Sequence, residues 1–494
     1  MSQPQIQTQH QTQAETATAS LGHWIDNKST PAAEGGVLQV LNPLDDSLYQ
    51  TVADGSEADI DLAVQSAHKA FQTYRNTSTT QREQWLANAA ALLEERKQEF
   101  IDALIDESGS TLAKARFETG KGISFVRAAI GMVRQMSGKT LPSDYPGRVS
   151  MTWREPRGVV AAITPFNVPL IKATRLSANA LATGSTVVLL PSEETPIVAL
   201  KFAELMAEAG FPPGVLNVVA GNGYKIGDSL ITHPQVKSVT FTGSTVVGKH
   251  IQQLCAEHNK HVTLELGGKN PLVILNDANL GEAVPGAVRG MFMHQGQVCI
   301  GSSRIYVEKD IYPKFIQTYE KVVGNLGMGD LRDDTTIIGP IISARQRDRV
   351  KRHIEDAKSK GAKVLTGGEW DGNRCAPTIL LDVTKDMDCH RQETFGPVAC
   401  VYQVDSFEEA MQQANDTEYG LSSAIYTSNI DRALEYAKNI EAGMVHINGP
   451  SLTDEAHVPF GGIGDSGFGR EGTEADMDAL TELKWVTIQT QQGS

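Results

Sequence analysis

The sequence predicts an α/β protein built from two open, doubly wound sheets. Short runs rich in Val and Ile alternate with stretches whose apolar residues recur at helical spacing, which is the pattern of parallel strands joined by helices. Two such series follow one another, with the segment VTLELGGKNP between them. The chain of 494 residues also exceeds the length at which one hydrophobic core stops growing. These observations predict two large lobes.

The part of the chain before the first strand series has a different character. Residues 1–20 are polar and Gln-rich, without the basic and apolar regions of a secretory signal, so we expect a disordered tail. Three amphipathic helices are then predicted at 58–75, 81–109 and 114–138.

The predicted strands of both series are short and apolar. Those of the first series lie at 158–165, 185–191, 215–221 and 238–244, and those of the second at 271–275, 304–309, 378–383, 398–404, 422–427 and 444–448. Helices of the second series are predicted at 312–326, 344–360 and 429–443. A last alternating strand, 482–491, has no local partner. Since an unpaired strand is an exposed edge, it either folds back within its own chain or is covered by a neighbouring subunit, which would predict an oligomer.

Composition limits the classes of function. The 44 basic and 59 acidic residues give a net charge of −15, which argues against a nucleic-acid-binding protein. The five cysteines form no CxxC pair and no Cys/His ligand spacing, so we expect neither a disulfide framework nor a metal site. No run of about 18 apolar residues occurs, so no membrane span is predicted and the expected compartment is the cytoplasm.

A glycine turn between a predicted strand and helix is a candidate phosphate site. The strand ends at Gly243 and Ser244, and the helix that follows has a single apolar face. Backbone N–H groups at such a helix start favour a phosphate group. The motif reads G-S-T-x-x-G, because Thr245 replaces the middle glycine of the dinucleotide fingerprint. The alternative is a tight turn whose Ser or Thr merely caps the helix.

Three polar side chains in unusual surroundings are candidate catalytic groups. Glu265 ends an apolar run in LELGG, where burial would raise its pKa toward that of a general base; the alternative is a strand end facing solvent. Asn167 lies between two prolines in PFNVP and could donate a hydrogen bond to an oxyanion, or simply shape the turn. Cys299 follows Gly296 in HQGQVCIGSSR, a loop with little side-chain bulk, which suits an accessible nucleophile, although most lone cysteines are inert.

Taken together in order, these stretches resemble the aldehyde dehydrogenase superfamily from about residue 22 to the end of the chain. The matching stretches are PFNVP, LPSEETP, FTGSTVVG, LELGGKNP, GQVC, ETFGP and PFGG…SGFGRE. The resemblance implies that Cys299 attacks an aldehyde carbonyl and that Asn167 stabilises the oxyanion. It implies that Glu265 activates the water that hydrolyses the thioester.

The resemblance also implies the cofactor residues. Gly243 and Ser244 would face the pyrophosphate of NAD, and Glu193 would bind the adenosine ribose and disfavour NADP. Leu190 stands where most relatives have a Lys that contacts this ribose, so the choice between NAD and NADP stays open. The remaining cofactor contacts would come from Glu393 at the nicotinamide ribose, from the neighbouring Phe395, from Phe166 in place of the usual Trp, and from Leu266.

A division into domains follows from the same resemblance. The tail 1–20 would precede a dinucleotide-binding domain, 21–133 and 157–262, and a catalytic domain, 263–470. Residues 134–156 and 471–494 would form a small β oligomerisation arm, which predicts a homodimer or homotetramer.

The substrate expected from this resemblance is an aromatic aldehyde such as benzaldehyde, a hydroxybenzaldehyde or vanillin. Arg175 is expected either to line the aldehyde tunnel or to lie on its rim without touching substrate. If its guanidinium bound a carboxylate, the substrate would be a semialdehyde such as succinate semialdehyde. A CoA-acylating enzyme is disfavoured by Glu265, and an NAD-independent thiol hydrolase using Cys299 is a further alternative.

Overall fold

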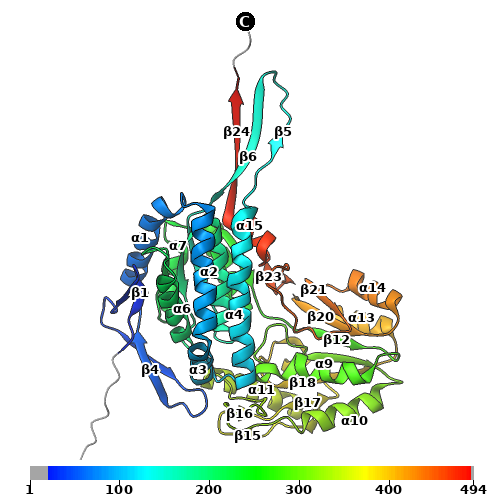
Figure 1. Ribbon diagram of the computed structural model, residues 1–494. Helices are drawn as coiled ribbons and strands as arrows, with labels where there is room; N and C mark the ends of the chain where they lie inside the picture. The colour runs from blue at the N-terminus through cyan, green and yellow to red at the C-terminus, as the bar shows by residue number, and fades with distance from the viewer. Residues whose placement is uncertain (1–19, 491–494) are drawn as a thin grey trace, which may run out of the picture.

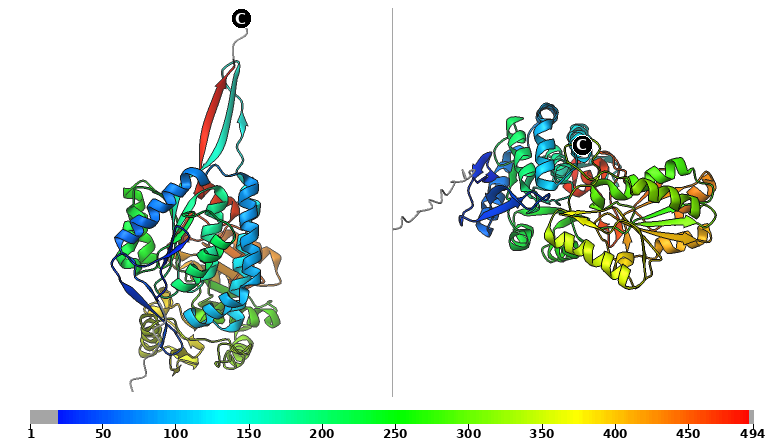
Figure 2. Two further views of the ribbon diagram at one scale, coloured as in Figure 1. Left: turned by 60° about the vertical axis from the view of Figure 1, so that its left-hand side comes forward. Right: turned by 90° about the horizontal axis from the view of Figure 1, so that it is seen from below.

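Two α/β lobes lie side by side, and a narrow β arm projects from the first lobe (Figures 1 and 2). The computed structural model describes residues 20–490. The predicted tail 1–20 therefore lies outside the described residues, apart from Ser20. Within the described part, no helix is long and apolar enough to cross a membrane.

The first lobe is organised by an eight-stranded sheet. Its order is β2-β1-β9-β8-β7-β10-β11-β23, and the five strands from β9 to β11 run parallel. The strands are β1 (His23–Ile25), β2 (Lys28–Thr30), β7 (Val159–Ile163), β8 (Thr186–Leu190), β9 (Leu216–Val218), β10 (Val236–Thr242), β11 (His261–Glu265) and β23 (Gly467–Phe468). Its helices are α1 (Glu57–Tyr74), α2 (Thr79–Glu95), α3 (Lys97–Ser108), α4 (Leu112–Met132), α5 (Pro169–Thr183), α6 (Pro196–Glu208), α7 (Gly223–Thr232) and α8 (Thr245–Glu257).

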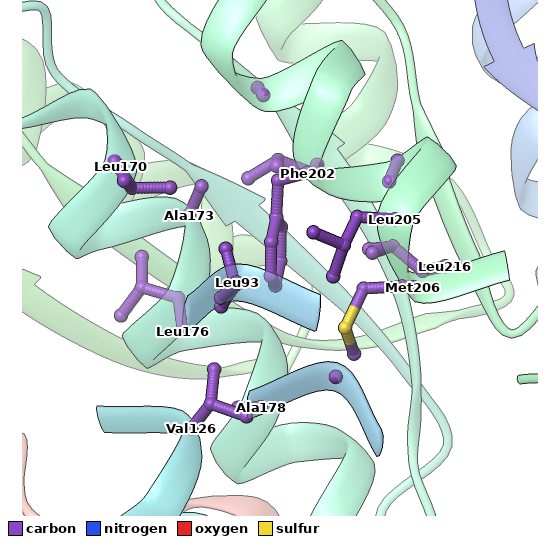
Figure 3. Packing of buried hydrophobic residues seen from close by; sticks show 14 of the residues in the cluster. Leu93, Val126, Leu170, Ala173, Leu176, Ala178, Phe202, Leu205, Met206 and Leu216 are labelled. Atoms are coloured by element: carbon purple, nitrogen blue, oxygen red, sulfur yellow. The ribbon is translucent and has the colours of Figure 1, made fainter. Parts of the chain in front are cut away.

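Helices cover both faces of this sheet because its central strands are apolar on both sides. In β7, Val160 and Ala162 join the core formed with α2 to α6, whereas Val159 and Ala161 join the core formed with α1, α7 and α8. Figure 3 shows the first of these cores, where Phe202 of α6 lies among side chains from neighbouring helices. Helix α5, which contributes Leu170 and Leu176 to this core, begins directly after the PFNV turn.

The second lobe contains a seven-stranded sheet of order β14-β17-β18-β13-β12-β20-β21, in which only the edge strand β14 is antiparallel. Its strands are β12 (Pro271–Ile274), β13 (Arg304–Glu308), β14 (Lys363–Thr366), β17 (Thr378–Leu381), β18 (Val398–Val404), β20 (Ser422–Tyr426) and β21 (Met444–Ile447). Its helices are α9 (Leu280–Phe292), η2 (Met293–Gly296), α10 (Tyr312–Val323), α11 (Ala344–Ser359), α12 (Asp388–Arg391), α13 (Phe407–Asn415) and α14 (Ile430–Asn439).

The arm consists of three strands and rises above α2 and α4 (Figure 1). It contains β5 (Thr140–Leu141), β6 (Arg148–Pro156) and β24 (Thr481–Gln489), with β24 antiparallel to β6 over its whole length. The remaining elements are β3 (Val37–Leu41), β4 (Leu48–Ala53), η1 (Val133–Gln135), β15 (Trp370–Asp371), β16 (Arg374–Cys375), β19 (Tyr419–Gly420), β22 (Ile463–Gly464) and α15 (Thr473–Leu480).

The two-lobed α/β class predicted from the sequence is confirmed, and the structure adds detail at three places. The helix predicted at 81–109 is two helices, since the backbone leaves helical geometry at Arg96 (ψ 16°) between α2 and α3. The C-terminal strand finds its partner, β6, within its own chain. The predicted boundary between residues 262 and 263 falls inside β11, so Glu265 still belongs to the first sheet.

Candidate active site

The candidate groups gather where the parallel strands of the first sheet end. Asn167 follows β7, Glu193 follows β8, Gly243 follows β10, and Glu265 is the last residue of β11. These four strands are neighbours in the order β8-β7-β10-β11. The carboxyl ends of parallel strands form the usual ligand-binding edge of an open α/β sheet.

The glycine turn after β10 caps a helix, as one of the two expectations from the sequence has it, and its phosphate-binding role stays a prediction. Ser244 caps α8, with its Oγ 3.5 Å from the N–H of Val247, and Gly243 N–H donates to the carbonyl of Glu265 at 3.0 Å. The first-turn N–H groups of Thr245 and Val246 have no acceptor among the described residues. A helix start with free N–H groups suits the pyrophosphate of a dinucleotide.

A second set of cofactor candidates comes from the loop between α12 and β18. Glu393 Oε1 accepts the N–H of Gly268 at 3.0 Å, and a Cβ on Gly267 would lie 2.5 Å from Glu393 Oε2. Burial raises the pKa of Glu393 to about 7. Phe395 meets Phe166 edge-on, with ring centroids 5.7 Å apart. The structure therefore places Glu393 beside the Gly267–Gly268 backbone that follows Glu265, and Phe395 against Phe166.

The residues around the adenosine end of the predicted site differ in burial and polarity. Glu193 is half-buried, and its carboxylate has no hydrogen bond or ion pair among the described residues, so it is free to accept ribose hydroxyls. Leu190 is 1% exposed and packs in the apolar core. Leu266 is also buried, against Gly248 of α8. These positions, together with the α8 N-terminus, fit a nicotinamide dinucleotide.

The loop that carries Cys299 is held by polar side chains that the sequence reasoning missed. Its backbone enters through left-handed conformations at His294, Gln295 and Gly296. The Gln295 side chain donates to the carbonyl of Pro340 at 2.7 Å and accepts the N–H of Gly339 at 3.0 Å. Such strained backbone persists only where its surroundings fix it.

Asn270 holds the other side of the same loop. Its Nδ2 donates to the carbonyls of Cys299 at 2.7 Å and Gly301 at 3.0 Å, while its Oδ1 accepts the N–H of Ser422. Asn270 lies within the GGKNP stretch that follows Glu265. That position is the feature of the sequence that could have identified Asn270 as part of the site. The loop that carries Cys299 is thus held on two sides by side chains of the second lobe.

Asn167 is brought to this loop as well. Its Nδ2 donates to the main-chain carbonyl of Gln297 at 2.8 Å, and the side chain is 4% exposed. An amide nitrogen carries two N–H groups, so one remains for another acceptor. The structure therefore places Asn167 against the backbone two residues before Cys299.

The Cys299 thiol lies in a largely apolar environment. It packs against the cluster of Ile300, Leu421, Met444 and Phe460. Burial raises the pKa of Cys299 to about 12, while Lys172 acts in the opposite direction and the nearby carboxylates of Glu393 and Glu265 raise it further. The thiol form is favoured in this structure, so the low pKa expected of a reactive cysteine has to come from bound ligands or from proton transfer to a base.

Glu265 is a buried carboxyl group, and burial is expected of a carboxyl group that acts as a general base. It is 2% exposed, and neither carboxylate oxygen has a hydrogen-bond partner among the described residues. Burial raises its pKa well above the usual value, and the charge of Glu471 raises it further. A carboxyl group with a raised pKa and free oxygens can take a proton from water at neutral pH.

A buried charge network adjoins Glu265, and most of it escaped the sequence reasoning. Lys172 Nζ donates to Glu471 Oε2 at 2.7 Å, and Arg175 Nε lies 3.0 Å from the same oxygen. Arg175 Nη1 also donates to Asp454 Oδ2 at 2.9 Å. A Lys inside the otherwise apolar segment NVPLIKATR was the available signal.

The structure corrects one of the two expectations for Arg175. The side chain is 1% exposed, between Phe125 and Phe460, whose ring centroids lie 4.8 and 5.2 Å from its guanidinium carbon. It is therefore not an exposed residue on an outer rim. Its charge is already matched by Asp454 and Glu471, which reduces the attraction left for a substrate carboxylate.

Comparison with known proteins identifies the family of the chain. Residues 30–486 match the model of the aldehyde dehydrogenase family. The vanillin dehydrogenase of Pseudomonas fluorescens is 39% identical, with 94% of this chain and 97% of that protein covered. The benzaldehyde dehydrogenase YfmT of Bacillus subtilis is 38% identical, with 95% and 97% covered.

Solved structures agree with the sequence comparison. The crystal structure of an E. coli NADP-dependent enzyme superposes with a TM-score of 0.93 at 34% identity, covering 95% of this chain and 98% of that one. The resemblance expected from seven short stretches is thus confirmed along nearly the whole chain. The chain belongs to the aldehyde dehydrogenase family and is an aldehyde-oxidising oxidoreductase that takes a nicotinamide cofactor.

Proposed function

We propose that this enzyme oxidises aromatic aldehydes, of the benzaldehyde, hydroxybenzaldehyde or vanillin type, to carboxylic acids with NAD. The observation that carries the proposal is the fixed thiol loop: Cys299 lies against apolar side chains, two residues beyond the carbonyl bound by Asn167. Apolar and aromatic surroundings favour an aromatic substrate over a charged one. The two relatives named for vanillin and benzaldehyde support the same substrate class.

Cys299 acts in this proposal as the nucleophile. Its sulfur attacks the aldehyde carbon and forms a thiohemiacetal, and the free N–H of Asn167 with the backbone N–H of Cys299 stabilises the oxyanion. Donors fixed before the reaction stabilise such charge strongly, because they need no reorganisation. The Lys172 charge favours the thiolate, since it opposes the rise in the pKa of Cys299 caused by burial.

The dinucleotide would be held by Gly243 and Ser244 at the pyrophosphate, by Glu193 and Glu393 at the two riboses, and by Phe166, Phe395 and Leu266 through packing. When bound, it supplies an acceptor for hydride. NAD is proposed over NADP because the Glu193 carboxylate would repel a 2′-phosphate. Leu190 neither attracts nor repels that phosphate, since it is buried in the core.

Glu265 completes the reaction by removing a proton from the water that hydrolyses the acyl group on Cys299. Its free oxygens and raised pKa suit this role. A CoA-acylating enzyme would not need a base that activates water. A hydrolase would not need the free α8 N-terminus, because it binds no dinucleotide. The semialdehyde alternative is weakened by the ion pairs of Arg175.

Initial rates with an aldehyde panel test the proposal. We expect NADH formation with benzaldehyde and vanillin, a lower kcat/KM with NADP, and loss of activity in Cys299→Ala but not in the matched variant Cys375→Ala, whose thiol lies in the second-lobe core. Faster turnover of succinate semialdehyde would replace the aromatic assignment. Ester hydrolysis without NAD binding would replace the dehydrogenase reaction.

The assembly and compartment belong to the same proposal. The arm exposes a row of large apolar side chains, and exposed apolar surface of this kind marks an interface. They are Leu141, Val149, Trp153, Leu483, Trp485 and Ile488. We therefore propose a homodimer or homotetramer in the cytoplasm, with the division into dinucleotide-binding domain, catalytic domain and arm given above. Light scattering would show a monomer if the arm had another role.

A further inference from the structure

A pocket at the base of the arm lies outside the proposed active site. It has a volume of about 700 Å³, opens to solvent, and is lined by the loop after α1, by α2, η1 and β6, and by the end of α5. Figure 1 shows this region, where the arm leaves the first lobe above α2 and α4. The charged residues of its lining are Arg75, Arg82, Arg134, Arg154 and Glu155. Four arginines in one pocket are unusual in a chain of net charge −15.

Arg82 differs from the other three arginines because it has no partner. Arg75 pairs with Glu155, Arg134 with Glu83, and Arg154 with Asp478. The Arg82 side chain is 6% exposed, and its Nε has no hydrogen-bond partner. Among residues 20–490, its guanidinium makes no hydrogen bond and no ion pair, and its two Nη atoms are not fully buried. Burial lowers the pKa of Arg82, as expected for a cation that lacks compensation.

An uncompensated guanidinium is expensive to bury, so native proteins almost always pair it. The C-terminal end of α5 lies close to Arg82 and favours its positive charge. A Cβ placed on Gly184, the C-cap of this helix, would lie 2.5 Å from Arg82 Nη1. The negative end of a helix dipole offsets only a small part of this cost for a cation. The five donors of a guanidinium are best satisfied by an oxyanion that accepts two of them in parallel.

We infer that this pocket is an anion-binding site for a phosphoryl group, with Arg82 as its central ligand. Arg75, Arg134 and Arg154 lie around it, with their charges partly matched by Glu155, Glu83 and Asp478. Inorganic phosphate and the phosphate of a small phosphomonoester share this chemistry, and the volume leaves room for the organic part of the latter. The site is separate from the pyrophosphate position at α8, because it is formed by α2, β6 and the opposite end of α5.

Phosphate binding to the full-length enzyme tests the inference. At constant ionic strength, we expect inorganic phosphate to raise the thermal midpoint saturably and to give a binding isotherm by calorimetry. Arg82→Gln should weaken phosphate binding by about tenfold or more, since each tenfold step corresponds to about 1.4 kcal/mol. Arg134→Gln, at an exposed position of the lining, should weaken it less. Arg116→Gln, whose side chain pairs with Asp334 on the surface, should leave it unchanged.

The outcomes are separable from folding and from the dinucleotide site. NAD affinity, measured by fluorescence quenching, should be unchanged in both Arg82→Gln and Arg134→Gln, which shows that the variants are folded. Tighter binding of glycerol phosphate than of inorganic phosphate would identify a phosphomonoester site. Absence of saturable phosphate binding to the wild type, or equal binding in Arg82→Gln, would overturn the inference.

Discussion

The side-chain amide of Asn167 donates a hydrogen bond of 2.8 Å to the main-chain carbonyl of Gln297. This contact joins the turn after β7 in the first lobe to the loop of the second lobe that carries Cys299. In the proposed mechanism, the remaining amide N–H of Asn167 would be the donor for a carbonyl oxygen bound at Cys299. The contact therefore links the positions of the proposed nucleophile and the proposed donor.

Replacing Asn167 by Ala removes both the loop contact and the oxyanion donor. We expect kcat for aldehyde oxidation to fall about 10²- to 10³-fold, the range measured when one oxyanion donor is lost. Steady-state kinetics with benzaldehyde measure the effect, and Asn325→Ala, at a surface position, is the control. A fall in NAD affinity without a fall in kcat would show that Asn167 shapes only the turn.

Replacing Glu265 by Gln should block hydrolysis and spare the earlier steps. The variant cannot deprotonate water, so we expect a burst of about one NADH per site followed by turnover slowed by about 10²- to 10⁴-fold. Because burial raises the pKa of Glu265, the wild-type deacylation rate should rise with pH over a range above the usual titration range of a glutamate, and the Gln variant should lack that rise. Stopped-flow fluorescence measures both phases. Loss of the burst itself would assign Glu265 to an earlier step.

The strands and the three candidate residues could be picked out from the sequence more readily than the contacts that position those residues. Cys299, Glu265 and Asn167 are identifiable because each sits in a short stretch of unusual composition. The partners of the Cys299 loop were not predictable, since Gln295 bonds to Pro340, far along the chain, and such pairing depends on tertiary packing. The raised pKa of Cys299 was not predictable from the sequence either, because the burial of this thiol is a property of the assembled lobes.

The buried Glu107 should make the stability of the first lobe fall with rising pH. Its carboxylate accepts the N–H groups of Ile197 and Val198 at the start of α6, yet burial raises its pKa to about 8. The unfolded chain releases this proton near pH 4.5, so between that value and about 8 the folded state binds more protons than the unfolded state. Over this range, the free energy of unfolding should therefore fall by up to about 1.4 kcal/mol per pH unit.

Denaturant unfolding at several pH values checks this expectation. The free energy of unfolding should fall less steeply with pH in Glu107→Gln than in the wild type. The exposed control Glu204→Gln should follow the wild type. Parallel pH profiles for all three proteins would mean that Glu107 titrates normally in the folded state.

Removing the ion pair between Arg175 and Asp454 should shift the substrate preference toward carboxylate-bearing aldehydes. In Asp454→Asn the guanidinium loses its 2.9 Å carboxylate contact, and its remaining partner, Glu471, is shared with Lys172. Because a charge-assisted hydrogen bond contributes about 1.5–3 kcal/mol, we expect kcat/KM for succinate semialdehyde relative to benzaldehyde to rise about tenfold or more. The surface variant Asp334→Asn is the control. An unchanged ratio in a folded Asp454→Asn enzyme would show that Arg175 does not face the substrate, and both the tunnel role and the semialdehyde alternative would then be excluded.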